Sequence, residues 1–167
     1  MIAYKFLNPG LKSNYDGSPW EIGKWRTVEP TQKECVGLNC SKLIVDALGY
    51  VQGKILAKVE YRGKIIDSGD KLTCEKMRVV KAWKWTKKES VKIAIFAARL
   101  VLPNFETTQT NDDRPRKAIE AAEKWPEKRI KKNLASAASA ASAADAAAKN
   151  KIHKYILTML KDMEEYR

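Results

Sequence analysis

The sequence changes character at Thr86, and this change constrains the fold more than any other feature. Before Thr86, short segments rich in β-branched and aromatic residues are separated by Gly, Pro, Asn and Asp, which is typical of strands and tight turns. From Thr86 on, apolar residues recur at helical spacing. We therefore predict an α+β fold, with a mostly β N-terminal half that contains one short helix and a C-terminal half of three to four helices. The expected parts are a β-rich domain over residues 1–85 and a helical region over residues 86–167, packed on it as one compact unit.

Two segments before Thr86 have the clearest strand pattern. Residues 54–61 and 77–85 carry β-branched and aromatic residues that partly alternate with charged ones. Turn residues at Arg62-Gly63 and at Ser68-Gly69-Asp70 predict that the chain reverses there. Residues 41–50 are the exception, because their apolar residues have helical spacing. They predict a short helix with Ser41 as its N-cap.

Capping signals and prolines divide the C-terminal half. Thr86 and Glu89 fit a capping box, which predicts a helix that Pro103 ends. Asp112 and Asp113 precede Pro115 and predict a second helix that reaches about residue 125. A third helix is expected from Pro126 through the Ala-rich tract. Asn150 is expected to mark a kink or a short break before a last helix over residues 152–165.

The tract of residues 135–148 consists almost entirely of Ala and Ser. Its polar residues recur every third position, at Ser136, Ser139, Ser142 and Asp145. Alanine has the highest helix propensity, so the tract is expected to be helical although it buries little area. Its small side chains allow another helix to approach closely. A packing helix of structural use only, a homo-oligomer contact and a ligand-binding role all remain open.

Composition bounds the classes of function. The formal net charge is +12, which favours anionic partners such as nucleotides, nucleic acid or acidic proteins. Three cysteines and no secretory signal predict reduced thiols and a cytoplasmic location, and no apolar run predicts a membrane span. A single histidine excludes a zinc site built on several imidazoles, and three cysteines are too few for a site of four thiolates. No phosphate-binding Gly loop and no nucleophile–base signature occurs, so we predict no metal, no cofactor and no catalytic residues.

Basic residues concentrate in two places, which supply the predicted ligand-binding residues. The first concentration is interleaved with tryptophans and the second lies at predicted helix starts, where backbone N–H groups favour anions. Two other interpretations stay open: the tryptophans belong to the core, and the helical cations form salt-bridged solvated faces. The candidate residues are Arg78, Lys81, Trp83, Lys84, Trp85, Arg114, Arg116, Lys117 and Arg129.

Several stretches resemble known families. The segments "AYKFL", "GLNCS", "DALGYVQGKILAKVEYRG" and "GDKL", between Ala3 and Leu72, resemble an uncharacterised domain family common in bacteriophage and prophage proteins, whose members often end in an Ala-rich helical region. Family members usually carry a histidine where this chain has Asn39, so any chemistry of that histidine is absent here. The segment "NDDRPRKAIEAAEKW", which begins at Asn111, resembles part of a family of immunity proteins.

Charge and resemblance together predict a function. The first hypothesis is a non-enzymatic, phage- or prophage-encoded protein that holds an anionic partner, either a nucleotide immune signal or nucleic acid, in counter-defence. One alternative is an enzyme that acts on a nucleotide or phosphorylated substrate. Another alternative is an immunity protein that neutralises a toxin.

Overall fold

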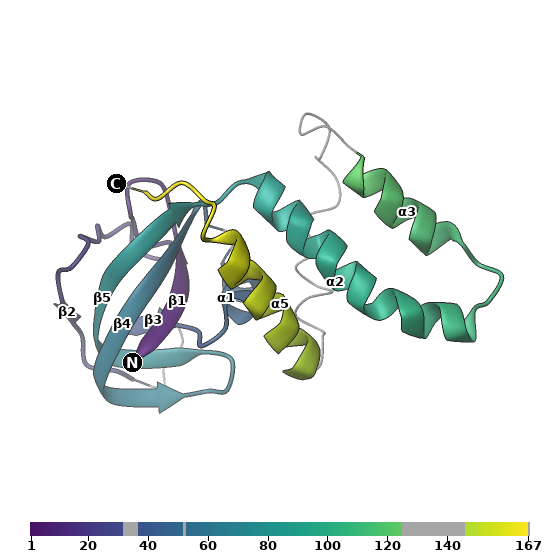
Figure 1. Cartoon of the computed structure of the whole chain (residues 1–167). Helices are drawn as coiled ribbons and strands as arrows, with labels where there is room; N and C mark the ends of the chain where they lie inside the picture. Colours follow the sequence, from purple (N-terminus) through teal and green to yellow (C-terminus); the bar gives the residue numbers. More distant parts are fainter. Residues whose placement is uncertain (32–36, 52, 125–145, 167) are drawn as a thin grey trace. The chain divides into compact units, whose positions relative to one another are not determined.

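A long β-hairpin forms the frame of the N-terminal half. In the computed structural model, β4 (Ile55–Asp67) pairs antiparallel with β5 (Leu72–Lys84), and the two are the longest strands in Figure 1. The chain reverses between them, where the Ser68 N–H donates to the Lys71 carbonyl oxygen over 2.9 Å. Gly69 has a φ of +89° in this turn, a conformation that residues with a side chain rarely adopt. The predicted turn at Ser68-Gly69-Asp70 is confirmed.

The structure describes residues 1–31, 37–51, 53–124 and 146–166. It divides into two compact units: Met1–Trp85 with Leu157–Arg167, and Thr86–Ile156. An antiparallel sheet occupies the first unit, and most of the four described helices belong to the C-terminal half of the chain. The predicted α+β class is confirmed. The predicted third helix and most of the Ala/Ser-rich tract lie outside the described residues.

The sheet closes on itself through short strands. On one side of the hairpin, β1 (Ile2–Leu7) pairs with β4, and on the other side β2 (Arg26–Thr27) and β3 (Leu38–Cys40) pair with β5. Directly after β3, Ser41 exchanges two backbone hydrogen bonds of 2.8 and 2.9 Å with Tyr4 of β1. Each strand of the ring β1, β4, β5 and β3 therefore pairs with the next, and the ring surrounds an interior.

The register of β1 decides which of its side chains enter that interior. Ala3 and Leu7 are fully buried in the main core cluster. Side chains two residues apart share one face of a strand, so Lys5 points into the same interior. Lys5 lies opposite Ala57 of β4, which in turn lies opposite Ala82 of β5. These two small side chains leave space around the lysine.

The helix predicted at residues 41–50 is present, but its predicted N-cap is wrong. The helix is α1 (Ile44–Tyr50), and Leu43 occupies the N-cap position without a side-chain hydrogen bond. Ser41 is held instead by its backbone pairing with Tyr4. That pairing extends the strand past Ser41, so the helix cannot begin there.

The predicted reversal at Arg62-Gly63 is also wrong, because β4 runs through both residues to Asp67. The register of β4 against β5 shifts between Arg62 and Ile65. Gly63 has a φ of +84° at this point, and the carboxylate of Glu75 accepts a 2.9 Å hydrogen bond from the Lys64 N–H. A β-bulge with a positive-φ glycine uses the same residue types as a tight turn, which explains the error.

Two of the described helices in the C-terminal half begin where the sequence predicts. The capping box is confirmed at the start of α2 (Lys87–Thr108), where the Glu89 carboxylate accepts a 2.9 Å hydrogen bond from the Thr86 N–H. The helix with Pro115 in its first turn is α3 (Arg114–Glu123), and the Asp112 carboxylate accepts from the Arg114 N–H over 3.1 Å. Both predicted starts are confirmed because each depends only on neighbouring residues.

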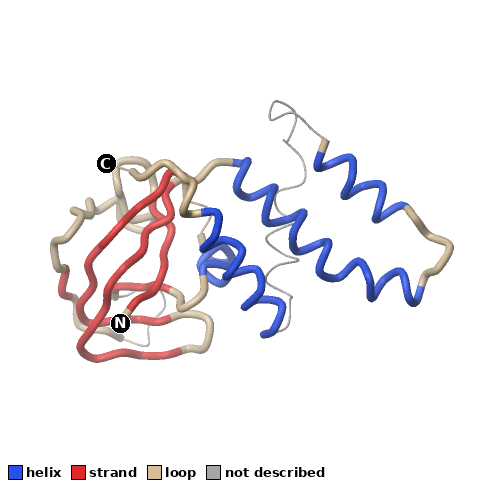
Figure 2. The backbone as a smooth tube through the Cα atoms, in the orientation of Figure 1, coloured by secondary structure: helices blue, strands red, loops and turns tan. Residues whose placement is uncertain are grey.

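Two predicted helix ends are wrong. Pro103 lies inside α2, which continues to Thr108 and bends along its length in Figure 2. A proline inside a helix removes one backbone hydrogen bond and kinks the helix without having to end it. Asn150 does not break the last helix, because α5 (Ala146–Met159) is continuous through it and ends before residue 165. Ile152 and Ile156 are fully buried, which stabilises α5 across that position.

The segment after α5 leaves the helical conformation and pairs with β5. The Tyr166 N–H donates to the Ala82 carbonyl oxygen over 2.9 Å, and the Lys84 ammonium contacts the Glu164 carboxylate at 2.6 Å. The Tyr166 hydroxyl also accepts a hydrogen bond from the Gly10 N–H over 3.1 Å. Residues 164–166 therefore fasten the C-terminal end of the chain to the N-terminal unit.

We predict that deletion of the chain from Lys161 onward lowers the free energy of unfolding of the N-terminal unit by about 2 kcal/mol, because two backbone pairings and the tyrosine hydrogen bond are lost. Urea denaturation followed by tryptophan fluorescence measures this change. The double variant Glu164→Gln/Glu165→Gln keeps the backbone pairing and should lose less than about 1 kcal/mol. Equal losses in both proteins would contradict the assignment of the effect to backbone pairing.

Candidate functional site

The first group of predicted binding residues lies on β5 and just after it. Trp83 and Trp85 are only 5% and 6% exposed, and the Trp85 ring packs edge-on against Phe6 with 5.2 Å between ring centroids. The three cations of the group all contact carboxylates. Arg78 pairs with Glu60, Lys81 with Glu165 and Lys84 with Glu164.

The second group lies at the start of α3 and is paired in the same way. Arg114 forms two hydrogen bonds of 2.8 and 2.7 Å with Asp112, and Arg116 forms two of the same lengths with Glu106. Lys117 contacts Asp113 at 2.6 Å. Arg129 lies outside the described residues. Ligand binding by either group stays a prediction, and the structure assigns each described cation an acidic neighbour.

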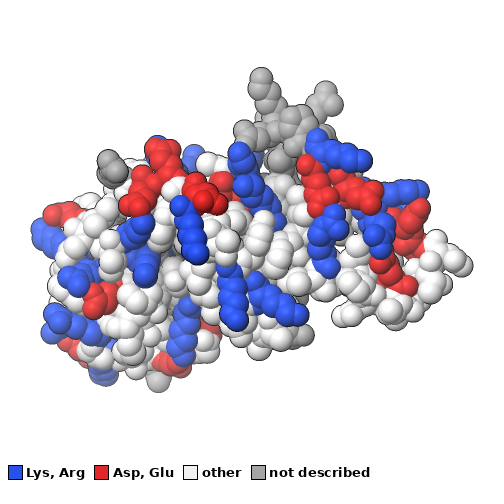
Figure 3. Space-filling view, in the orientation of Figure 1, with Lys and Arg blue, Asp and Glu red and all other residues white. Residues whose placement is uncertain are grey.

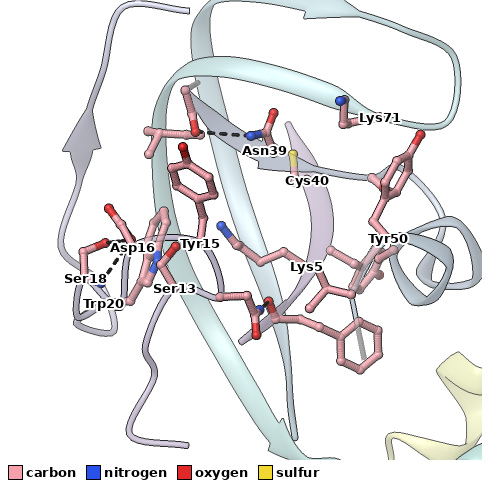
Figure 4. Close-up of a pocket in the computed structure, with 18 of the residues that line it drawn as sticks. Lys5, Ser13, Tyr15, Asp16, Ser18, Trp20, Asn39, Cys40, Tyr50 and Lys71 are labelled. Atoms are coloured by element: carbon pink, nitrogen blue, oxygen red, sulfur yellow. Dashed lines mark hydrogen bonds between the residues drawn. The ribbon is translucent and has the colours of Figure 1, made fainter. Parts of the chain in front are cut away.

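A pocket of about 560 Å³ opens in the N-terminal unit, in a place that the sequence did not indicate (Figure 4). Its walls come from β1, from the loop of residues 13–20, from β2 and β3, and from the end of α1. Pockets that bind small molecules usually measure 300–1,000 Å³. The size and the partial enclosure by five parts of the chain identify this pocket as the candidate site.

Two cations converge on one tryptophan in this pocket. The Lys5 ammonium lies 4.4 Å and the Arg26 guanidinium carbon 4.5 Å from the centroid of the Trp20 ring. Trp20 is buried, so its ring is a fixed support for both charges. Burial lowers the pKa of the Lys5 ammonium to about 8, and the positive charge of Arg26 acts in the same direction. Among the described residues, no carboxylate forms an ion pair with either cation.

A short hydrogen-bonded turn holds Arg26 in place. Its guanidinium donates to the Ser18 hydroxyl over 2.9 Å, and that hydroxyl donates to the Asp16 carboxylate over 2.7 Å. The Ser18 N–H donates to the same carboxylate oxygen over 3.0 Å. These hydrogen bonds from Ser18 lower the pKa of Asp16 to about 2, so Asp16 is a fixed negative charge at neutral pH and a weak base.

Tyr50 and Lys71 form a different end of the pocket. Figure 4 shows them across the pocket from Asp16, Ser18 and Trp20, with the Lys5 chain between the two groups. The Tyr50 hydroxyl donates to the Asp70 carboxylate over 2.6 Å, which raises the pKa of Tyr50 to about 12. The Lys71 ammonium lies 5.5 Å from the centroid of the Tyr50 ring. This end therefore offers an oriented aromatic ring and a further cation.

Two buried thiols lie beside Lys5. The Cys40 and Cys74 sulfur atoms are 3.9 Å apart on the neighbouring strands β3 and β5. Hydrogen bonding to Cys74 and burial raise the pKa of the Cys40 thiol. A buried neutral thiol is a poor nucleophile, so Cys40 contributes a packing surface to the pocket wall.

The described residues contain no cluster of three or more His, Cys, Asp or Glu side chains that could hold a metal ion. In the pocket, the carboxylate of Asp16 is committed to Ser18. Among the helices that the structure describes, none is long and apolar enough to cross a membrane.

Sequence reasoning missed Lys5, Arg26, Trp20 and Tyr50. These four residues are spread over the first 50 positions and belong to no sequence motif, so no local pattern indicates that they form a site. One available signal was the alternation of Ala3, Lys5 and Leu7, which places a lysine in line with two apolar residues. Tyr4 and Phe6 make the other face of the strand equally apolar, so the sequence did not reveal which face is the interior.

We predict that Lys5→Met raises the free energy of unfolding of the ligand-free protein by about 1–3 kcal/mol, because it removes a charge that the interior disfavours. The pKa of Lys5 is about 8 when folded, against an ordinary value of 10.5. The unfolded chain therefore binds more protons between these values. The gain in the free energy of unfolding from Lys5→Met should be complete below pH 8 and should shrink as pH rises toward 10.5. Urea denaturation at pH 7 and pH 10 tests this, and a pH-independent difference would contradict it.

Two family models match the chain, and their boundary lies near Thr86, where the sequence changes from strand to helix patterns. Residues 82–160 match a family model described as "Imm-5 like putative immunity protein", which confirms the resemblance of the C-terminal half to immunity proteins. The bacteriophage origin stays a prediction. No curated protein and no solved structure matches the chain. Residues 1–90, which contain every residue that lines the pocket, match a second family model, and the chain therefore belongs to the family described as "Domain of unknown function (DUF7666)".

Proposed function

We propose that the N-terminal unit is a binding module that holds a small anionic ligand in its pocket without making or breaking a bond. The observation that carries this proposal is the convergence of Lys5 and Arg26 on Trp20, 4.4 and 4.5 Å from the ring centroid, inside a pocket of about 560 Å³. The described residues supply neither cation with an ion-pair partner.

Partial burial of Lys5 and Arg26 reduces their hydration, and a bound anion can offset this loss. A cation removed from water is unfavourable unless an opposite charge or hydrogen bonds compensate. On the surface of this protein the compensation is internal, as in the pairs Arg99–Glu123 and Arg116–Glu106. Asp16 is the carboxylate among the described pocket-lining residues, it acts on Lys5, and it is held by Ser18. A bound anion would supply the missing charge.

The geometry favours a small ligand over nucleic acid. Binding of a duplex requires a broad run of cations that contact successive phosphates. Figure 3 shows acidic atoms interspersed with the basic ones over the face in view. A pocket with walls from five parts of the chain instead suits a molecule that can be surrounded. If the phage resemblance reflects the origin of the chain, such a module would sequester a signal of host defence.

We predict that pyridoxal 5′-phosphate, used as an anionic aldehyde probe, labels Lys5 in preference to the exposed Lys12. The amine and the aldehyde form an imine with loss of water, and borohydride then reduces the C=N bond to a stable amine. The lowered pKa of Lys5 makes more of its amine neutral, and Arg26 attracts the phosphate. At pH 7.5, just below the pKa of Lys5, peptide mass spectrometry should find Lys5 labelled at least about fivefold faster than Lys12.

Two controls separate the pocket from general lysine reactivity. Arg26→Gln should reduce labelling of Lys5 and leave that of Lys12 unchanged. Added inorganic phosphate at low millimolar concentration should protect Lys5 selectively. Equal labelling of the two lysines, with no protection, would overturn the proposal.

A second candidate function is neutralisation of a toxin by the helical unit, and the match of residues 82–160 to an immunity-protein model favours it. We predict that a toxin partner, if captured by the tagged full-length chain, is retained by Lys5→Gln. The triple variant Arg114→Glu/Arg116→Glu/Lys117→Glu should lose it, because that change reverses the exposed charge at the start of α3. The opposite pattern, measured by quantitative mass spectrometry, would place recognition in the pocket.

A further inference from the structure

We infer that the ligand of the pocket is a nucleoside phosphate, with its phosphate held between Lys5 and Arg26 and its base placed against Tyr50. This inference rests on the proposed function and adds the chemical class of the ligand and its direction in the pocket. The argument depends on the difference between the two ends of the pocket.

The Trp20 end is built for a compact anion. Lys5 and Arg26 present two positive charges over one ring, and the turn of Asp16 and Ser18 orients the guanidinium. Asp16 acts on Lys5 electrostatically but forms an ion pair with neither cation, so both cations can contact a bound anion. Arginine can bind phosphate through two parallel N–H donors, and lysine adds a compact point charge. A dianionic phosphate complements this end better than a single carboxylate does.

The Tyr50 end is built for a flat ring. Tyr50 is 50% exposed although it lines the pocket. Its hydroxyl is tied to Asp70 over 2.6 Å, so the orientation of the ring is set before any ligand arrives. An exposed and oriented aromatic ring stacks on nucleobases at a small entropic cost. Lys71, across the mouth of the pocket from Trp20 in Figure 4, adds a positive charge near the same ring.

The separation of the two ends defines the class of ligand. Figure 4 shows the Lys5 side chain in the middle of the pocket, with its amine on the side of Trp20 and with Tyr50 on the other side. A ligand that uses both ends must carry an anion and a planar ring joined by a spacer. In a nucleotide the sugar is that spacer. Simple phosphates fill one end only, and uncharged nucleosides fill only the other.

The experiment compares three probes on the full chain by isothermal titration calorimetry: AMP, ribose 5-phosphate and adenosine. We expect AMP to bind about tenfold more tightly than ribose 5-phosphate, since stacking of one base is worth that much or more. Adenosine should bind more weakly than AMP by a larger factor, because both cations then stay uncompensated. Lys5→Gln should weaken AMP and ribose 5-phosphate together.

A matched pair of tyrosine variants tests the direction of the ligand. Tyr15 also lines the pocket and is 76% exposed, but Figure 4 places it on the side of Asp16 and Trp20. Tyr50→Ala should lower the affinity for AMP to that for ribose 5-phosphate, and Tyr15→Ala should leave the ratio of the two unchanged. If Tyr15→Ala removes the advantage of AMP instead, the inferred direction is wrong.

The pH dependence provides an independent readout. The charged or titratable groups that act on Lys5 are Arg26, Asp16 and the two thiols Cys40 and Cys74. Because the pKa of Lys5 is about 8, AMP affinity should fall about tenfold from pH 7 to pH 9 as the amine loses its proton. The AMP phosphate stays dianionic over this range. Lys5→Arg should flatten the profile, whereas a profile due to a thiol would persist in that variant.

The outcomes separate the two proposals. Equal binding of AMP and ribose 5-phosphate, unaffected by Tyr50→Ala, overturns the inference and leaves the anion-binding function intact. Absence of binding by all three probes, together with equal labelling of Lys5 and Lys12 by pyridoxal 5′-phosphate, overturns both. Arg26→Gln provides a second route to the same test if Lys5→Gln fails to fold, and circular dichroism checks each variant.

Discussion

The pairing of β1 with β4 is the constraint on which the rest of the N-terminal unit depends. This register turns Ala3, Lys5 and Leu7 into the closed sheet and sets Lys5 opposite Ala57. A shift of one residue would exchange the two faces of β1 and would place Tyr4 and Phe6 in the interior instead. The pairing of Tyr4 with Ser41 closes the ring and holds β3 at the same site. One set of backbone hydrogen bonds thus produces both the core and the charge inside it.

The positive charge of this protein is present in two physical states. All described lysines and arginines of the predicted binding groups contact carboxylates at the surface, where such pairs contribute little stability. Lys5 and Arg26 differ because they lie against a buried tryptophan and lack such a partner among the described residues. A formal charge of +12 counts all of these groups equally. Only the environment of each group distinguishes a solvated cation from one that favours a ligand.

The sequence predictions were accurate where neighbouring residues decide the structure and failed where contacts between distant parts of the chain decide it. The capping box at Thr86 and the helix start at Pro115 were predicted correctly because neighbouring residues decide them. Pro103 was predicted to end a helix and Asn150 to kink or break one. Whether a helix continues depends on tertiary packing, as in α5, where Ile152 and Ile156 are buried after Asn150. The same limit applies to the site. The predicted residues were close together in sequence, whereas the pocket gathers residues of β1, β2, β3 and α1.

By itself, the sequence determined the α+β class, the change at Thr86, the strand character of residues 54–61 and 77–85 and the excess of positive charge, since propensity, capping and composition are properties of short segments. Only the tertiary structure decided that Lys5 faces the interior and that Arg26 shares Trp20 with it. It also decided that residues 164–166 return to β5. These facts depend on strand register and on the closure of the sheet, which join residues that no local pattern connects.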